Sequence, residues 1–318
     1  SEVLGRLHVN TVIETDDEVL WIGARTGLYR AESGRIEQYD EQAGLPEDAF
    51  VQSLMIDRSS RLWVGLDNGG VARHCAGRFD YLVGTGGLAQ ARINHLAEDA
   101  EGNVWVSTGG SGLIQMRQGL ARPLTEKQGL PDFPVLPIVQ GADGAMWFGT
   151  FGGGVARRMN GRVETLSVAE GLVSDQVLSL WPDGERVWVG TRGGLSVIED
   201  GRVSRNWTEA DGLPHPTVGS MVMEGERLWL GTVEGLAEMT EQGFRRWQPE
   251  GGFGGYIVGL LVDRDGTLWI ASDGGGVFMR RGEEIVRAPF DDQLPSRTVT
   301  SLYESHSGLL WATTATGL

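Results

Sequence analysis

The sequence predicts an all-β fold, namely a β-propeller of four-stranded antiparallel blades, with seven complete blades plus a partial eighth. The first observation is a set of eight tryptophans spaced 40 to 42 residues apart: Trp21, Trp63, Trp105, Trp147, Trp188, Trp229, Trp269 and Trp311. A period near 40 that is held along the chain indicates one supersecondary unit copied repeatedly. The second observation is that the 49 glycines fall mainly at repeated places within the copies. Four short strands in about 42 residues are the content of one propeller blade.

Each copy contains four segments with the pattern of strands. The first is an apolar run that ends in a polar turn, as in residues 50–60 (FVQSLMIDRSS) and 256–266 (YIVGLLVDRDG). The second carries the tryptophan and leads through Thr, Ser or Asp into glycines, which predicts a tight turn and a third strand. The fourth follows a Gly-centred turn and holds an apolar or aromatic residue 18 or 19 positions after the tryptophan: Tyr39, Tyr81, Leu124, Leu166, Trp207 and Trp247.

Other architectures fit the sequence less well. Helical repeats of similar length are excluded because they need apolar residues at a 3.6-residue period and few glycines. The apolar content of 40% is sufficient for a core. The sequence contains no run of 18 apolar residues, so we predict no transmembrane helix. The N-terminus has no basic segment followed by an apolar run, so we expect any secretion signal to be absent or already removed.

The repeats set the expected boundaries. Residues 1–297 hold seven repeats. Residues 298–318 hold the first two strands of an eighth and the beginning of its third, and this unit is either the eighth blade of the same ring or the start of a second propeller. The chain lacks an initiator Met and stops within the repeat motif, so we expect it to be a piece of a longer protein.

Charge and chemistry exclude several functions. The formal net charge is −16, whereas binding to phosphate backbones requires clustered Lys and Arg, so we predict no nucleic-acid partner. The single cysteine, Cys75, cannot form an intrachain disulfide. The five histidines lack metal-ligand spacing, and we find no serine elbow, Cys–His pair or repeated carboxylate dyad. We therefore predict no catalytic residue, no metal and no cofactor, and hence a protein that is not an enzyme.

The repeat motif D-x-x-G-x-L-W-I-G-T-x-x-G-L resembles the two-component regulator propeller repeat. It is present at residues 263–270 and 188–195, and a Gly-Leu-Pro linker joins units at 44–46, 129–131 and 212–214. The linkers at 87–89 and 171–173 and the glycine-rich segment 251–255 depart from this pattern.

The resemblance covers essentially the whole chain and implies a function. It implies a periplasmic sensor region of a bacterial membrane receptor, coupled to a kinase, a diguanylate cyclase or a transcription-factor output in the same parent chain. A signal would pass through ligand-biased packing or through a homodimer.

Candidate ligand-binding residues lie in loops that propeller geometry brings to one mouth of the channel. These loops join the second strand to the third and one blade to the next, and ligands usually bind at that face. The residues there vary between copies, and we select Arg25, Asp67, Asn68, Phe151, Arg192, His215, Glu234, Tyr256 and Asp273. Their mixture of carboxylates, Arg, Asn and aromatic rings suits a small polar ligand such as an oligosaccharide.

Two alternatives and one residue stay open. Asp263-Arg264-Asp265-Gly266 before Trp269 is similar to the Asp-box of sialidases, which makes a carbohydrate-active enzyme (lyase or glycosidase) one alternative, and a protein-interaction scaffold is the other. The repeated tryptophans are expected to pack between blades. Trp181 has no counterpart tryptophan in the other copies, so it is a candidate contact for a partner or ligand.

Overall fold

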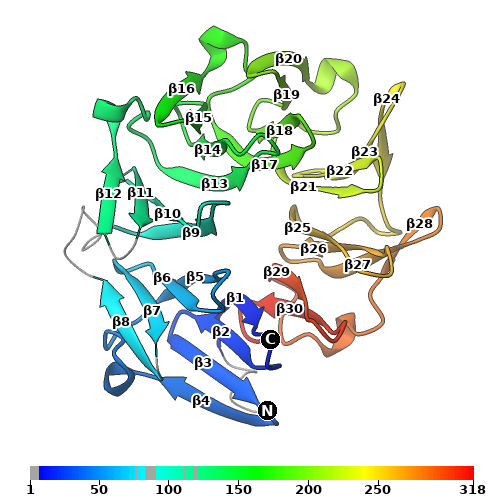
Figure 1. Cartoon of the computed structure of the whole chain (residues 1–318). Coiled ribbons are helices and arrows are strands. Elements are labelled where there is room, and N and C mark those ends of the chain that lie inside the picture. Colours follow the sequence, from blue (N-terminus) through cyan, green and yellow to red (C-terminus); the bar gives the residue numbers. More distant parts are fainter. Residues whose placement is uncertain (1–6, 76, 83–90, 111, 118–119) are drawn as a thin grey trace.

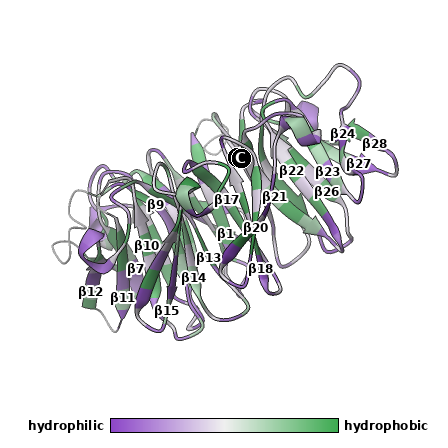
Figure 2. Ribbon diagram, turned by 90° about the horizontal axis from the view of Figure 1, so that it is seen from above, coloured by the Kyte–Doolittle hydropathy of each residue, from purple (hydrophilic) through white to green (hydrophobic). Residues whose placement is uncertain are grey.

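The computed structural model describes residues 7–75, 77–82, 91–110, 112–117 and 120–318, and it has the predicted ring (Figure 1). Seven four-stranded antiparallel sheets and one two-stranded sheet surround a channel, which confirms the predicted fold class. Within each complete sheet the strands follow one another in chain order from the channel outward. Viewed edge-on, the blades carry hydrophobic stretches along their strands, while hydrophilic residues gather at the turns (Figure 2).

The strands are grouped here by their place in the blade. The innermost strands are β1 (Val9–Glu14), β5 (Val51–Ile56), β9 (Ile93–Glu98), β13 (Val135–Gln140), β17 (Val177–Asp183), β21 (Val218–Glu224), β25 (Ile257–Val262) and β29 (Val299–Glu304). The second strands are β2 (Leu20–Ala24), β6 (Leu62–Leu66), β10 (Val104–Thr108), β14 (Met146–Thr150), β18 (Arg186–Thr191), β22 (Arg227–Thr232), β26 (Leu268–Ser272) and β30 (Leu310–Thr314). The third strands are β3 (Gly27–Glu32), β7 (Val71–Cys75), β11 (Leu113–Arg117), β15 (Val155–Met159), β19 (Leu195–Glu199), β23 (Gly235–Thr240) and β27 (Gly276–Arg281). The outermost strands are β4 (Arg35–Tyr39), β8 (Arg78–Leu82), β12 (Leu120–Leu124), β16 (Arg162–Leu166), β20 (Arg202–Trp207), β24 (Gly243–Trp247) and β28 (Glu284–Arg287).

The repeated tryptophans pack between neighbouring blades, as predicted. The first six are at most 6% exposed, whereas Trp269 and Trp311 are only partly buried. Trp229 lies 5.3 Å from Trp247 of the outermost strand of the same blade, and both belong to a cluster with residues of the next blade, including Phe278. Apolar burial of this kind is the main force that holds adjacent sheets together.

Short 3₁₀ helices form the links between several blades. They are η2 (Glu41–Ala43), η4 (Glu126–Gln128), η5 (Val168–Glu170), η6 (Glu209–Asp211) and η7 (Asp291–Gln293). Thr125 and Gln128 form a capping box around η4, and Gly129 ends the helix in the left-handed conformation at φ 90°. Ser167 and Thr208 begin η5 and η6 in the same way. The Gly-Leu-Pro linker motif thus begins where such a helix stops.

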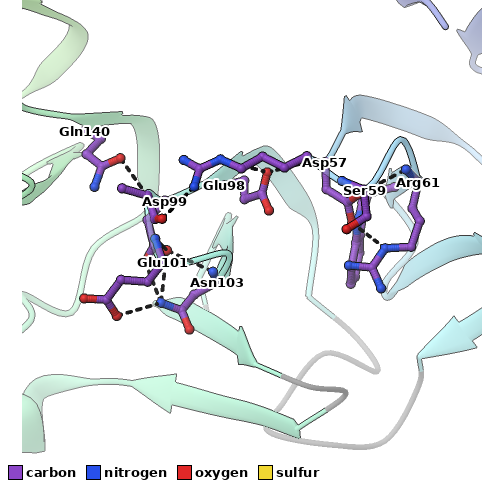
Figure 3. A network of polar contacts seen from close by, with 11 residues as sticks. Asp57, Ser59, Arg61, Glu98, Asp99, Glu101, Asn103 and Gln140 are labelled. Atoms are coloured by element: carbon purple, nitrogen blue, oxygen red, sulfur yellow. Dashed lines mark hydrogen bonds and ion pairs between the residues drawn. The ribbon is translucent and has the colours of Figure 1, made fainter. Parts of the chain in front are cut away.

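An aspartate organises the turn between the first and second strands. Asp57 accepts hydrogen bonds from the backbone of Ser59 at 2.9 Å and of Arg61 at 3.0 Å, and from Trp63 Nε1 at 2.8 Å (Figure 3). Burial alone would raise its pKa, but the bonds from Trp63, Arg61 and Ser59 outweigh burial and lower it. Asp99 makes the equivalent bonds in the next blade, including one of 2.7 Å from Trp105 Nε1. The turn therefore anchors the tryptophan of its own blade.

Neighbouring blades are also joined at these turns. Glu98, at the end of β9, accepts a hydrogen bond of 2.8 Å from the backbone of Arg58 in the preceding blade. Gln140 accepts the equivalent bond of 2.9 Å from Ala100 (Figure 3). We call this contact the interblade clamp, and it recurs where Glu14 of the first blade accepts from the backbone of His306.

The β29–β30 hairpin fills the eighth position of the ring. β29 contacts both β25 and β1, so the innermost strands form a closed circle. Thr300 Oγ1 donates to the carbonyl of Val9 at 2.9 Å, as Asn10 Nδ2 donates to Val51 at 2.8 Å in the first blade. Trp311 packs on the apolar face of the first blade. The two alternatives that the sequence left open for residues 298–318, the eighth blade of the same ring or the start of a second propeller, both stay predictions.

Candidate ligand site at the channel and its mouth

The two kinds of loop named above meet at one mouth of the channel. In seven of the eight blades of the described chain, the residue after the second strand donates a backbone hydrogen bond to the residue before the first strand. Arg25 donates to His8 at 2.9 Å, and Asp273 donates to Tyr256 at 3.0 Å. The candidate residues of both loop types therefore stand side by side on this mouth.

Three of these loop contacts pair side chains that suit ligand binding. The Asp273 carboxylate forms a hydrogen bond with the Tyr256 hydroxyl, which raises the pKa of this tyrosine. The guanidinium of Arg192 lies over the ring of Phe151 in the preceding blade, 5.1 Å from its centroid. Asp67 forms an ion pair with Arg92, which lies just before β9 of the next blade. The mouth thus carries aromatic, cationic and acidic side chains.

The other candidates have more local roles. Asn68 donates a hydrogen bond to the backbone carbonyl of Asp48. Arg25 lies over the ring of Phe50 at 5.7 Å. His215 and Glu234 contact none of the other candidates through an interaction found among the described residues. His215 Nδ1 accepts from the backbone of Thr217 at 3.0 Å, and Glu234 forms an ion pair of 3.5 Å with Arg246. The nine residues therefore form pairs and single positions, not one cluster.

The channel itself contains a cavity that the sequence analysis missed. It has a volume of about 830 Å³ and is lined by the innermost strands β5, β9, β13, β17, β21 and β25 together with Arg92. This volume lies within the range of about 300 to 1,000 Å³ that is usual for small-molecule sites. None of the nine predicted residues lines this cavity, although Asp67 forms an ion pair with Arg92, which does line it.

A β-bulge near the start of each innermost strand shapes this cavity. The pairing with the second strand skips one residue in seven of the eight strands and two residues in β13. Bulges re-aim side chains and recur beside binding sites. The sequence contains a signal for them, because buried residues stand three apart and not two, as at Val9 and Val12 or Val177 and Leu180. The residues at this position are Asn10, Gln52, Asn94, Leu136, Leu178, Gly219, Val258 and Thr300.

Two side chains in the cavity are distinctive. His95 lies on the wall of the open channel and is surrounded by other parts of the protein. The resulting loss of hydration lowers its pKa, so the imidazole is neutral at pH 7. Trp181, which the sequence marked as unusual, pairs with Trp188 across β17 and β18 and also lines the cavity. Its position allows a ligand contact.

Comparison with known families identifies the repeat. Residues 87–110 and 251–274 match the family described as two component regulator propeller. Residues 87–90 lie outside the described part of the chain. The remainder of each match covers the innermost hairpin of a blade, β9–β10 or β25–β26, together with the mouth loops. These two segments therefore match the two component regulator propeller repeat, in agreement with the resemblance that the motifs predicted.

Solved structures share the architecture at low sequence identity. A computationally designed protein, Ika8, is 16% identical, with 98% of this chain and 95% of that chain covered and a TM-score of 0.74. A catalytically inactive virginiamycin B lyase from Staphylococcus aureus is 15% identical, with 86% and 94% covered and a TM-score of 0.63. The extracellular domain of a protein described as a hybrid two component system from B. thetaiotaomicron is 19% identical, with 96% and 44% covered and a TM-score of 0.48. This chain thus spans less than half of that extracellular domain. The likenesses to Ika8 and to the lyase show the propeller fold alone.

No curated protein matches the sequence. Among the described residues, no helix is both long enough and apolar enough to cross a lipid bilayer.

Proposed function

We propose that this propeller is a non-catalytic sensor of a polar ligand such as an oligosaccharide, bound at the channel face. It would form the extracytoplasmic, periplasmic part of a bacterial membrane receptor, with a kinase or cyclase output in the same parent chain. The observation that supports the proposal is the set of side chains at the mouth of the channel. Loops of the two component regulator propeller repeat present varied aromatic, cationic and acidic side chains there, beside an open cavity.

The division of labour within the repeat supports this proposal. The tryptophans, the turn aspartates and the interblade clamps recur from blade to blade and hold the ring together. The mouth positions vary among the blades, and they include an Arg–Phe stack and a Tyr–Asp hydrogen bond. A ring of constant frame and variable mouth is the arrangement expected of a binding scaffold, in which function lies in the loops.

A thermal-shift screen with glycans and other small polar ligands tests the proposal. A specific ligand at 100 times its Kd should add about 2.7 kcal/mol to the free energy of unfolding. Arg192→Ala should weaken that stabilisation, whereas Arg227→Ala, a substitution at the first residue of β22, should not. A screen in which no compound stabilises the protein would contradict the sensor proposal and favour an interaction scaffold.

A turnover measurement separates the sensor from the carbohydrate-active alternative. Any ligand found by the screen is incubated with the protein, and the products are analysed by mass spectrometry. The proposal predicts an unchanged ligand. Bond cleavage that is lost in Glu234→Ala or Asp273→Ala would instead identify an enzyme.

A further inference from the structure

We propose that the ligand of this sensor is a neutral oligosaccharide that binds within the channel, between a hydrogen-bonding wall on the second and third blades and an apolar wall on the fourth to seventh. The inference rests on the proposed function for the existence of a ligand and goes beyond it in placing and classifying that ligand. The mouth residues would then surround the entrance to the site.

The two walls follow from the bulges of the innermost strands. At the bulge the second and third blades place Gln52 and Asn94, whose side chains carry amides. The fourth, fifth and seventh place Leu136, Leu178 and Val258. All five line the cavity. The same backbone device therefore aims polar groups from one side and apolar groups from the other.

The polar wall is pre-organised. Asn94 Nδ2 donates to the carbonyl of Val135 at 2.9 Å, which fixes the orientation of the amide. Its Oδ1 accepts no hydrogen bond from the described residues and is available to a hydroxyl. His95 and Gln52 stand on the same wall, and the imidazole is neutral, so it can both donate and accept.

The apolar wall suits the face of a sugar ring. Leu178 and Trp181 of β17, Pro137 of β13 and Met221 of β21 line that side of the cavity. A pyranose ring presents C–H groups on its faces and hydroxyl groups along its edge. A site with one apolar wall and one hydrogen-bonding wall therefore matches both parts of a sugar, as small-molecule sites usually combine apolar surface with a few placed polar groups.

Charge restricts the ligand to neutral sugars. The chain has 43 acidic residues, yet none of the described side chains that line the cavity is a carboxylate. Arg92, the one Arg or Lys among these described lining residues, is paired with Asp67. A charged ligand would lose its hydration there without gaining a free counter-charge. The cavity thus differs from the acidic outer surface.

Two matched asparagines provide the test. Asn10 occupies the bulge of β1 and donates to Val51 at 2.8 Å, as Asn94 donates to Val135, but Asn10 does not line the cavity. Asn10→Leu and Asn94→Leu therefore remove the same interblade hydrogen bond, while only Asn94→Leu alters the polar wall. Leu178→Asn introduces an amide into the apolar wall.

Binding of cellotetraose, maltotetraose and chitotetraose is measured by calorimetry for the wild type and the three variants. We expect at least one sugar to bind, with Kd raised about 5- to 10-fold by Asn94→Leu, as for one lost neutral hydrogen bond, and by Leu178→Asn. Asn10→Leu should change Kd less than 2-fold. Equal effects of Asn10→Leu and Asn94→Leu would overturn the placement, as would binding that responds only to Arg192→Ala at the mouth.

The failure of this inference is distinct from failure of the proposed function. If none of the three sugars binds but the broader thermal-shift screen finds another polar ligand, the oligosaccharide inference is refuted and the sensor proposal stands. If both measurements are negative, both are refuted.

Discussion

The hydrogen bond between the turn aspartate and the repeated tryptophan can be measured with two equivalent residues. Trp63 of the second blade and Trp147 of the fourth occupy the same place in the repeat, and their side chains are 4% and 3% exposed. An arginine lies over each ring, at 5.6 Å for Trp63 and 5.4 Å for Trp147. They differ at the indole nitrogen. Nε1 of Trp63 donates to Asp57 at 2.8 Å, whereas the fourth blade has Gly141 at that position and Nε1 of Trp147 has no acceptor among the described residues.

Replacement of each tryptophan by Phe isolates this difference. Both substitutions remove the same ring volume and weaken the same kind of cation–π contact, so these losses cancel in the comparison. Trp63→Phe also removes a hydrogen bond to a charged acceptor, a loss of about 1.5 to 3 kcal/mol. Asp57 keeps its bonds from Ser59 and Arg61, which favours the lower part of that range. We expect Trp63→Phe to lower the free energy of unfolding by about 2 kcal/mol more than Trp147→Phe.

Guanidinium unfolding followed by far-UV circular dichroism at about 215 nm provides the measurement, because this signal comes mainly from the backbone of the strands. The two variants are compared at equal m-values, so that the shift in midpoint reports stability. Equal losses of stability would refute the reasoning, because they would show that the aspartate contributes nothing beyond the shape of the turn.

Three further predictions concern the clamp, the turn and the mouth. Glu14→Ala removes the acceptor for the backbone of His306, so hydrogen exchange in β29–β30 should become faster, with a loss of about 1 to 2 kcal/mol in local stability. Unchanged exchange there would contradict closure of the ring through this interblade clamp. The pKa of Asp57 is lowered in the folded protein, so its ionised form stabilises the fold above about pH 4. The difference in free energy of unfolding between the wild type and Asp57→Asn should therefore shrink as the pH falls further. A difference that does not change with pH would be inconsistent with this linkage. Tyr256→Phe should remove one tyrosine of raised pKa from a spectrophotometric titration while lowering stability by less than about 1 kcal/mol, and an unaltered titration would show that Asp273 does not perturb it.

The sequence was sufficient for the blade but not for the ring. The tryptophan period and the glycine turns predicted four strands per unit, because a local pattern determines local pairing. Closure depends on the angle between successive blades, which no short motif encodes. The contact from Thr300 to Val9, 291 residues apart, therefore became apparent only in three dimensions.

The candidate site was predictable at its mouth and not in its interior. Loop residues such as Tyr256 and Asp273 stood out because they break the repetition, and the structure brings these two together. Asn94 and Leu178 lie inside strands, where they look like ordinary alternating residues. The direction of these two side chains depends on a β-bulge. In the sequence the bulge is indicated only by buried residues that stand three positions apart.

Hydrogen-exchange mass spectrometry with and without a bound tetrasaccharide tests the central claim that the channel face senses a ligand. The account predicts slower exchange in the peptides that contain β5, β9 and β17 and in the loops that contain Arg192 and Asp273, with the outermost strands unchanged and the sugar recovered intact. Protection confined to the outermost strands, or cleavage of the sugar, would contradict it.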